Sequence, residues 1–431
     1  MRHLLAASLA ATALLASPDD ALAGKLKPGQ TKVVSWTKAT GGTPKSSGTP
    51  ALSQTGRYVA FRTQRTELAG KASNNKMQIL RHDRELGTYE VCSVTEQGAL
   101  CLDDCQVPEI SADGRYVTFD TDHNLDPTDL NNKRDVYRYD STTQKAVRAS
   151  RTYQGLTPNH ASFSAKMSSD GRMVTFMSYA TNMLASAGNG KRQVYRRDMQ
   201  TGVVLLCSAA LNGAYATENA GEPAISDDGR YVVFSTSAPN IGPSGQNIFR
   251  RDTFLGSTKL ISKSHDGSPI DGGCFAPLIS GDGSTVAFSS YATNITKKDK
   301  SKKTTDLFVV DVASGKVKQF VTKKGSKKAD SFASDISGGG RWIAVNTSFS
   351  KEIPPKQGEI HPTYEYTDRI SLIDAKKGKV RVVSKSSAGT TGNECSEAAI
   401  SGNGKIIAFS SSDKKMGKDK DSYQDVYVHR R

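Results

Sequence analysis

Two loops of this 431-residue chain repeat one spacing of oxygen-bearing side chains, Asp-x-Asn/Asp-x₃-Asp. The residues are Asp129, Asn131 and Asp135 in the first loop and Asp419, Asp421 and Asp425 in the second. Oxygen ligands at alternating loop positions suit Ca²⁺, which takes about six to eight of them. The pattern lacks the central glycine and final glutamate of an EF-hand, and an Asx-turn that leads into a strand explains the same residues. Calcium is thus a candidate cofactor, and a purely structural turn is the alternative.

Three cysteines, Cys92, Cys101 and Cys105, lie within 14 residues of one another. The chain has six cysteines in all, an even number that is typical of disulfide-bonded exported proteins. Because the intervening loop is short, a local bridge from Cys92 to Cys101 or Cys105 is feasible. Zinc at Cys101 and Cys105 would need further ligands that the neighbouring sequence lacks. The sequence therefore predicts at least one disulfide that involves these three residues.

Lysines concentrate in the loops of the last third of the chain. Residues 291–431 hold 27 Lys and Arg against 16 Asp and Glu, so most of the net charge of +15 lies there. The densest loop carries Lys297, Lys298, Lys302 and Lys303. Such an arc of positive charge could bind an acidic polymer or a membrane surface, whereas the alternative is solubility and protection of strand edges. Nucleic acid is disfavoured because the lysines are not interleaved with aromatic residues.

Motifs of common enzymes are missing from the sequence. It contains no H-E-x-x-H, no G-x-S-x-G and no P-loop, and its histidines are dispersed. An enzyme built from this chain would have to assemble its site from residues that are far apart in sequence.

The elements that must position these residues come from a phrase that recurs seven times, as in Glu109–Phe119 and Pro223–Phe234. Its turn glycines are Gly56, Gly114, Gly171, Gly229, Gly283, Gly340 and Gly404. Their spacings of 58, 57, 58, 54, 57 and 64 residues mark a repeat architecture. Within one repeat, two β-branched and aromatic strands flank an Asp-Gly turn, and two more follow. Four antiparallel strands per repeat predict an all-β, seven-bladed β-propeller.

The two ends of the chain indicate how the ring closes. The last repeat ends after its third strand, at Asp425–His429, and the chain stops at Arg431. Thr31–Thr37 resembles the fourth strands of the other repeats, so we expect the N-terminal strand to complete the last blade. Aspartates that recur at the end of the third strand are expected to bond the following turn. They are Asp83, Asp140, Asp198, Asp252, Asp311 and Asp374.

The repeated pattern P-x-[IL]-S-x-D-G-R-x-[VI]-x-F, followed by D-[VI]-[YF]-x-x-D, resembles the TolB-like, WD-repeat-like propeller repeats of bacterial exported proteins. The resemblance covers about Thr31 to Arg431 and implies the blade structure, but it says little about function. The family often has Pro before the Asp-Gly turn, where this chain has Ala112, Ser169, Asp227 or Gly281. TolB itself carries an additional N-terminal α/β domain, so its Tol–Pal role does not carry over.

Residues 1–23 have the features of a signal peptide, with Arg2 and His3 before an apolar stretch and a cleavage site after Ala23. We therefore expect an exported protein, periplasmic or extracellular, in which residues 24–431 form one propeller domain. The expected function is a non-enzymatic scaffold for protein or envelope interactions, without a transmembrane segment or a nucleic-acid partner. A carbohydrate-active lyase or hydrolase at the channel mouth and a binder of anionic envelope polymers are the alternatives.

Overall fold

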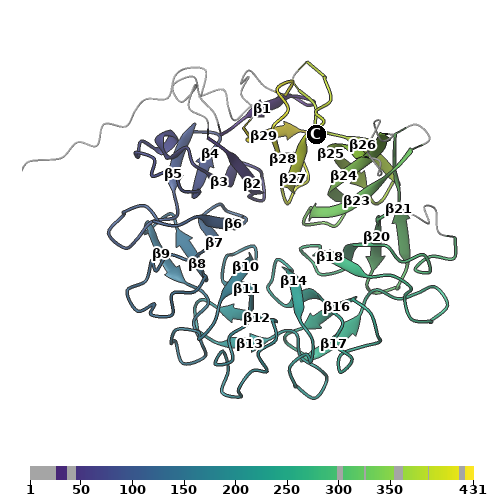
Figure 1. The fold of residues 1–431 in the computed structure, drawn as a ribbon, viewed down its shortest axis with the longest axis horizontal. Helices are drawn as coiled ribbons and strands as arrows, with labels where there is room; N and C mark the ends of the chain where they lie inside the picture. The colour runs from purple at the N-terminus through teal and green to yellow at the C-terminus, as the bar shows by residue number, and fades with distance from the viewer. Residues whose placement is uncertain are drawn as a thin grey trace, which may run out of the picture.

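A computed structural model describes residues 26–35, 45–298, 304–324, 327–353, 363–386, 388–416 and 423–431. Seven antiparallel sheets stand as blades around a central channel (Figure 1). The predicted seven-bladed β-propeller is confirmed. The one helical element of the described residues is a short 3₁₀ turn, Thr66–Ala69.

The blades follow the chain in order, and the first strand of each lies nearest the channel (Figure 1). Blade one contains β2 (Ser47–Leu52), β3 (Tyr58–Thr63), β4 (Gln78–Asp83) and β5 (Thr88–Val91). Blade two contains β6 (Cys105–Ile110), β7 (Tyr116–Thr121), β8 (Asp135–Asp140) and β9 (Lys145–Arg148). Blade three contains β10 (Ser162–Met167), β11 (Met173–Ser178), β12 (Gln193–Asp198) and β13 (Val204–Leu206). Blade four contains β14 (Ala220–Ile225), β15 (Tyr231–Thr236), β16 (Asn247–Asp252) and β17 (Ser257–Leu260).

Blade five contains β18 (Cys274–Ile279), β19 (Thr285–Ser290), β20 (Asp306–Asp311) and β21 (Val317–Phe320). Blade six contains β22 (Thr322–Lys324), β23 (Lys327–Ile336), β24 (Trp342–Ile353), β25 (Thr363–Asp374) and β26 (Lys379–Val382). Blade seven contains β27 (Cys395–Ile400), β28 (Ile406–Ser411), β29 (Asp425–Arg430) and, from the N-terminal end, β1 (Thr31–Val33). Blade six departs from the four expected strands because β24 and β25 continue to 12 residues each and β22 pairs with the extended β23.

The Asp-Gly turns and the aspartates after the third strands form one repeated unit. Gly114 has a φ of 78°, and a Cβ there would collide with the ring of Tyr58 from the preceding blade, so glycine is required on both counts. In blades one, two, three, four and six, the arginine after the turn pairs with the aspartate that ends the third strand, as Arg115 does with Asp140 at 2.7 Å. Asp140 also accepts the N–H of Thr142, which confirms its expected role in the turn.

The apolar core lies between neighbouring blades. Second and third strands contribute stacked aromatic pairs, such as Phe176 with Tyr195 and Phe288 with Phe308. The core side chains of each such pair are almost fully buried. Burial of these rings in blades two, three, four, five and seven, and of aliphatic side chains in blades one and six, holds the blades together.

Ring closure follows the prediction for the N-terminal strand. β1 pairs antiparallel with β29, with Thr31 opposite His429. Ser35 Oγ donates to the buried Asp425 carboxylate at 2.6 Å. The strand itself is shorter than predicted, three residues against the seven of Thr31–Thr37.

A closed hoop of backbone hydrogen bonds joins the seven turns between first and second strands. In each step the N–H of one blade donates to the carbonyl of the next, over 2.7–3.0 Å, and Asn403 N–H returns to Gln54 O. The carbonyl acceptors are Ala112, Ser169, Asp227, Gly281, Gly338, Gly402 and Gln54. We call this end of the propeller the turn face and the opposite end, where the first strands begin, the inter-blade face.

Candidate binding site in the channel and at its mouth

A cavity of about 190 Å³ occupies the channel and is lined by the first strands of all seven blades. Aliphatic residues such as Ile110, Ile225 and Ile400 are among the lining residues, but more polar than apolar surface faces the space. Three charged residues of the first strands line it, Glu109 from β6, Lys166 from β10 and Asp335 from β23, and a fourth, Asp227, follows β14 at the turn. The cavity is concave and holds several convergent polar groups, as small-ligand sites do, but its wall is more polar than is usual for them.

These three charged residues occupy the same position in their repeats. Glu109 pairs with Thr118, Lys166 with Thr175 and Asp335 with Ala344, each one step before the last residue of the first strand. The other blades place Ala51, Ala224, Leu278 and Ala399 at this position. Equivalent positions in a propeller lie at one level of the channel, so the charges face a common space.

The two carboxylates at this level, Glu109 and Asp335, differ in their partners. Lys166 Nζ forms an ion pair with Glu109 Oε1. Asp335 instead accepts two backbone N–H groups, from Ile336 at 2.8 Å and from Ile400 at 2.7 Å, and no ion pair of Asp335 occurs among the described residues. Burial raises the pKa of Asp335 to about 7, and the negative charge of Glu109 adds to that effect. Burial opposes the charge of Lys166, yet its pKa is raised because Glu109 and Asp335 attract the ammonium.

At the turn face, the side chains of Gln54 and Asp227 lie against glycines of neighbouring blades and narrow the channel. A Cβ at Gly402 would collide with Gln54 Oε1, and one at Gly281 would collide with the Asp227 carboxylate. A Cβ at Gly338 would lie 3.6 Å from Asp227 Oδ2 and 3.9 Å from Gln54 Nε2. Gln54 and Asp227 therefore converge over these glycines, at the level of the hydrogen-bonded hoop. Burial together with Asp228 and Asp282 raises the pKa of Asp227.

Five aromatic side chains gather at the other end of the channel, on the inter-blade face. We call this set the aromatic rim: Phe163, Tyr179, Phe275, Tyr291 and Phe332. The Phe275 ring lies 5.2 Å from that of Tyr291 and 6.1 Å from that of Phe332. Tyr291 is 59% exposed, and the other four are half-buried. Exposed, mutually packed aromatic rings are typical of the centre of a binding surface.

Blade four separates the two halves of the rim. At the place where blades three and five have Phe163 and Phe275, blade four has Gly221. A Cβ on Gly221 would lie 2.7 Å from Arg192 Nη2, so the guanidinium covers the glycine. Glu222 accepts the N–H of Ala276 in the next blade at 3.0 Å. The rim thus consists of two aromatic groups on either side of an arginine and a carboxylate.

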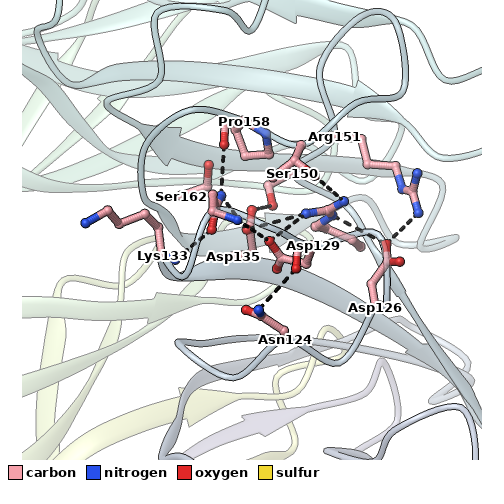
Figure 2. A network of polar contacts seen from close by, with 12 residues as sticks. Asn124, Asp126, Asp129, Lys133, Asp135, Ser150, Arg151, Pro158 and Ser162 are labelled. Atoms are coloured by element: carbon pink, nitrogen blue, oxygen red, sulfur yellow. Dashed lines mark hydrogen bonds and ion pairs between the residues drawn. The ribbon is translucent and has the colours of Figure 1, made fainter.

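The predicted calcium loop of blade two contains a buried arginine. Asp126, Asp129 and Asp135 gather above the sheet (Figure 2), and the Arg148 guanidinium lies among them. Arg148 Nη1 is 3.0 Å from Asp129 Oδ1 and 3.7 Å from Asp135 Oδ2, and its side chain is fully buried. The positive charge that calcium would bring is already supplied by the protein. Burial and the neighbouring Asp129 raise the pKa of Asp135, while Ser150 and Arg148 oppose the rise.

The loop also forms the turns that the structural alternative requires. Asn131 N–H points to Asp129 Oδ1 at 3.4 Å, and Lys133 N–H donates to Asn131 Oδ1 at 2.6 Å. Asp135 accepts from the hydroxyl of Ser150 on the fourth strand, and Asp425 accepts in the same way from Ser35. Gln78 and Gln193 repeat this contact in other blades, which marks it as part of the blade framework.

Asp419 and Asp421 lie outside the described residues. Among the described residues, no group of three or more His, Cys, Asp and Glu side chains is arranged to hold a metal ion. Calcium binding stays a prediction.

All six cysteines are buried and appear as free thiols. Cys101 Sγ lies 3.2 Å from Thr121 Oγ1, and the neighbouring Cys105 thiol lowers the pKa of Cys101 to about 6. Burial raises the pKa of Cys105 and of Cys92. Cys274 and Cys395 donate to Ser290 and Ser411, the contact that Ser162 makes with Ser178. A disulfide at Cys92, Cys101 or Cys105 remains a prediction.

The lysine arc is only partly described. Lys297 and Lys298 are exposed beside blade five, whereas Lys302 and Lys303 lie outside the described residues. Glu109, Lys166, Asp335 and the aromatic rim were not recognised from the sequence. An alignment of the seven repeats would have shown three charges at one otherwise apolar position and three phenylalanines, Phe163, Phe275 and Phe332, at another equivalent position of the first strands.

This fold and site define a seven-bladed β-propeller, and solved structures of the same fold match the chain. The β-propeller domain of the Trilobed protease from Pyrococcus furiosus, described as having an open velcro topology, matches with 11% identity and a TM-score of 0.51 over 90% of this chain and 96% of that one. A TolB-like protein from Agrobacterium tumefaciens matches with 18% identity and a TM-score of 0.40 over 64% of this chain and 81% of that one.

The RRP9 WD40 repeats match with 8% identity and a TM-score of 0.47 over 93% of this chain and 97% of that one. No protein-family model and no curated protein matches. At these identities the likeness concerns the fold alone. None of the helical segments among the described residues is long and apolar enough to span a bilayer.

Proposed function

We propose that this protein is an exported, non-enzymatic propeller scaffold that binds a polypeptide partner of the cell envelope on its inter-blade face. The observation that carries the proposal is the aromatic rim, whose five rings come from three blades and include the exposed Tyr291. Aromatic side chains are enriched at the centres of protein interfaces, where they bury a large area at little entropic cost. Export rests on the signal-peptide features of residues 1–23, which lie outside the described residues.

The rim can be tested by its removal from the full chain. We expect Phe275→Ala/Tyr291→Ala to abolish specific cross-linking of the tagged protein to its envelope partner. Phe254→Ala is a matched control because Phe254 is 82% exposed and lies after the third strand of blade four, on the turn face. Equal loss in both variants, or no loss in either, would contradict a partner site at the rim.

A second candidate function is carbohydrate cleavage in the channel. Glu109 and Asp335 are two carboxylates that face one cavity, and the raised pKa of Asp335 is a property of general acids. Release of reducing ends from envelope polysaccharides by the wild type, but not by Glu109→Gln, would favour the enzyme over the scaffold.

The lysine arc supplies a third test. Attraction between solvated charges is screened over about 8 Å at physiological ionic strength, so polymer binding through lysines should weaken steeply with salt. Replacement of Lys297, Lys298, Lys302 and Lys303 by Ser leaves every strand intact. If binding to envelopes falls with salt and with this variant, an anionic polymer is a partner; if neither matters, the aromatic rim alone carries recognition.

A further inference from the structure

Cys101 and Cys105 face the same hydroxyl group at the entrance to blade two. Cys101 Sγ lies 3.2 Å from Thr121 Oγ1, and Cys105 is the direct cross-strand partner of Thr121. The two thiols are also hydrogen-bonded to each other, and both side chains are fully buried. Because the two sulfurs are already in contact, we expect rotation of the side chains to be enough to bring them to bonding distance.

The loop that leads into blade four shows that the fold does not need cysteines at these positions. Ala220 begins β14 as Cys105 begins β6, and Ala216 precedes it by the same four residues. The carbonyls of Cys101 and Ala216 each accept two side-chain amides, over 2.7–2.9 Å. The donors are Asn74 and Gln78 at Cys101, and Asn189 and Gln193 at Ala216. Alanine thus meets the packing requirement, so packing alone does not explain the pair of thiols.

The two thiols differ in their readiness to ionise. The Cys105 thiol and the Thr121 hydroxyl lower the pKa of Cys101 to about 6, whereas burial raises the pKa of Cys105. A stabilised thiolate is the form that attacks a disulfide, and a stabilised reduced state makes the resulting disulfide easier to reduce. Cys92 does not compete, because it lies beside the backbone of Arg81 and burial raises its pKa.

The loop between the two cysteines lies at the surface and is held by side-chain contacts. Leu102 is 65% exposed, and its N–H donates to His123 Nδ1 at 3.0 Å. Asp104 is exposed and accepts the N–H of Met77 at 2.8 Å. Local opening of these contacts gives a small reagent access to the thiols without the unfolding of a blade.

We propose that Cys101 and Cys105 are a redox-active pair, which closes into an intrachain disulfide by exchange with a low-molecular-weight disulfide and reopens when small thiols are in excess. The Cys101 thiolate attacks one sulfur of the external disulfide and releases the other as a thiolate. The Cys105 thiolate then attacks Cys101 Sγ and displaces the second external sulfur. Two electrons pass to the external disulfide, and the two protons of the protein thiols end on the two released thiols. The pair does not involve the aromatic rim, so it stands apart from the proposed scaffold function.

Thiol mapping of the full-length protein in glutathione buffers tests the pair. Reduced protein is equilibrated with stepped ratios of glutathione and glutathione disulfide, trapped with acid, unfolded and alkylated. Cleavage after Glu96 separates Cys92 from the pair before mass spectrometry. We expect Cys101 and Cys105 to lose alkylation together as glutathione disulfide increases and to regain it in excess glutathione, while the other four cysteines stay alkylated. A structural disulfide resists reduction by glutathione, so reopening identifies a redox-active pair.

Single variants test the order of attack. Cys105→Ser lacks the second thiol, so we expect its Cys101 to accumulate as the mixed disulfide with glutathione. Cys101→Ser should form at least tenfold less mixed disulfide at Cys105. The matched control is Cys274→Ser, which changes a buried thiol at the position equivalent to Cys105 to the serine that blade three has as Ser162. This control should oxidise as the wild type does.

Four outcomes would overturn the proposal: a bridge that includes Cys92, loss of alkylation at only one of the pair, no bridge at any ratio, or a bridge that glutathione does not reopen. Protein refolded from denaturant in the same buffers is the second starting point, so slow access to the buried thiols is not mistaken for absence of the bridge. Cys101→Ala/Cys105→Ala imitates Ala216 and Ala220 and should melt at the same temperature as the reduced wild type. A large loss of stability would show instead that the thiols serve packing.

Discussion

Two clusters of charged side chains lie inside this propeller, and they differ in how completely their charges are paired. In blade two, Arg148 is enclosed by Asp126, Asp129 and Asp135 and has no exposed side-chain surface. In the channel, Asp335 faces a cavity with only backbone partners. A closed cluster has nothing left to offer a ligand, whereas an open one beside a cavity does. The degree of pairing, more than the number of carboxylates, separates a structural cluster from a candidate site.

Removal of Arg148, the cation of the closed cluster, should reduce the stability of the protein more than any other change described below. Arg148→Leu leaves Asp129 and Asp135 buried without a counter-charge, while Asp126 keeps Arg151, so we expect the free energy of unfolding to fall by about 3–5 kcal/mol. Chemical denaturation measures this loss. A combined variant, Arg148→Leu/Asp129→Asn/Asp135→Gln, imitates blade three, which has Leu206 and Gln193 at the equivalent positions, and it should recover much of the stability. No recovery would mean that the cluster matters for more than its charge.

Removal of Lys166, the cation of the channel cluster, should lower the free energy of unfolding by less. Lys166→Met removes the ammonium that faces Glu109, but water in the cavity can solvate the freed carboxylate. We expect a loss of about 1–2 kcal/mol, measured by the same denaturation experiment. A loss as large as that of Arg148→Leu would show that the two clusters are equally closed.

Asp335 should make stability depend on pH in a defined direction. Its pKa is about 7 in the folded protein against about 3.9 in an unfolded chain, so the folded state binds the proton more tightly. The wild type therefore loses stability relative to Asp335→Asn as pH rises from about 4 to 7, by about 1–3 kcal/mol, and the difference levels off above pH 7. Thermal unfolding of both proteins across this range measures it. A difference that grows towards low pH would have the wrong sign.

Added calcium should change the stability of the protein least. Because Arg148 already lies between Asp129 and Asp135, we expect Ca²⁺ added after chelation to leave the melting temperature within about 1 °C. A clear rise that disappears in Asp421→Asn, and not in Asp129→Asn, would place a calcium site in the second loop.

The fold could be predicted from the sequence because the contacts that shape each blade join residues of the same repeat. The Asp-Gly turns, the arginine that follows them and the aspartate after the third strand are local in sequence and interact within one blade. Even the closing strand could be recognised by its likeness to other fourth strands. The extension of blade six was not predicted, because its 12-residue strands β24 and β25 continue into a region where the repeats differ in loop length.

The sites could be predicted only in part, since they depend on contacts between distant residues. Asp129 and Asp135 were recognised as a pair of oxygen ligands, but Arg148 reaches them only because β9 lies beside β8. Glu109, Lys166 and Asp335 are separated by 57 and 169 residues, and only the closed ring brings them to one level. The aromatic rim depends on the same closure.

The seam of blade seven has a mechanical consequence. The chain's two end strands, β1 and β29, are joined by three residue pairs, while most other neighbours within blades share four to six. A pulling force applied to the two ends would load that short ladder first and peel the N-terminal strand away from β29. The backbone hoop at the turn face lies outside that seam and would still hold the seven turns together. An anchor or a partner that stretched the two ends could thus open one blade without dismantling the ring.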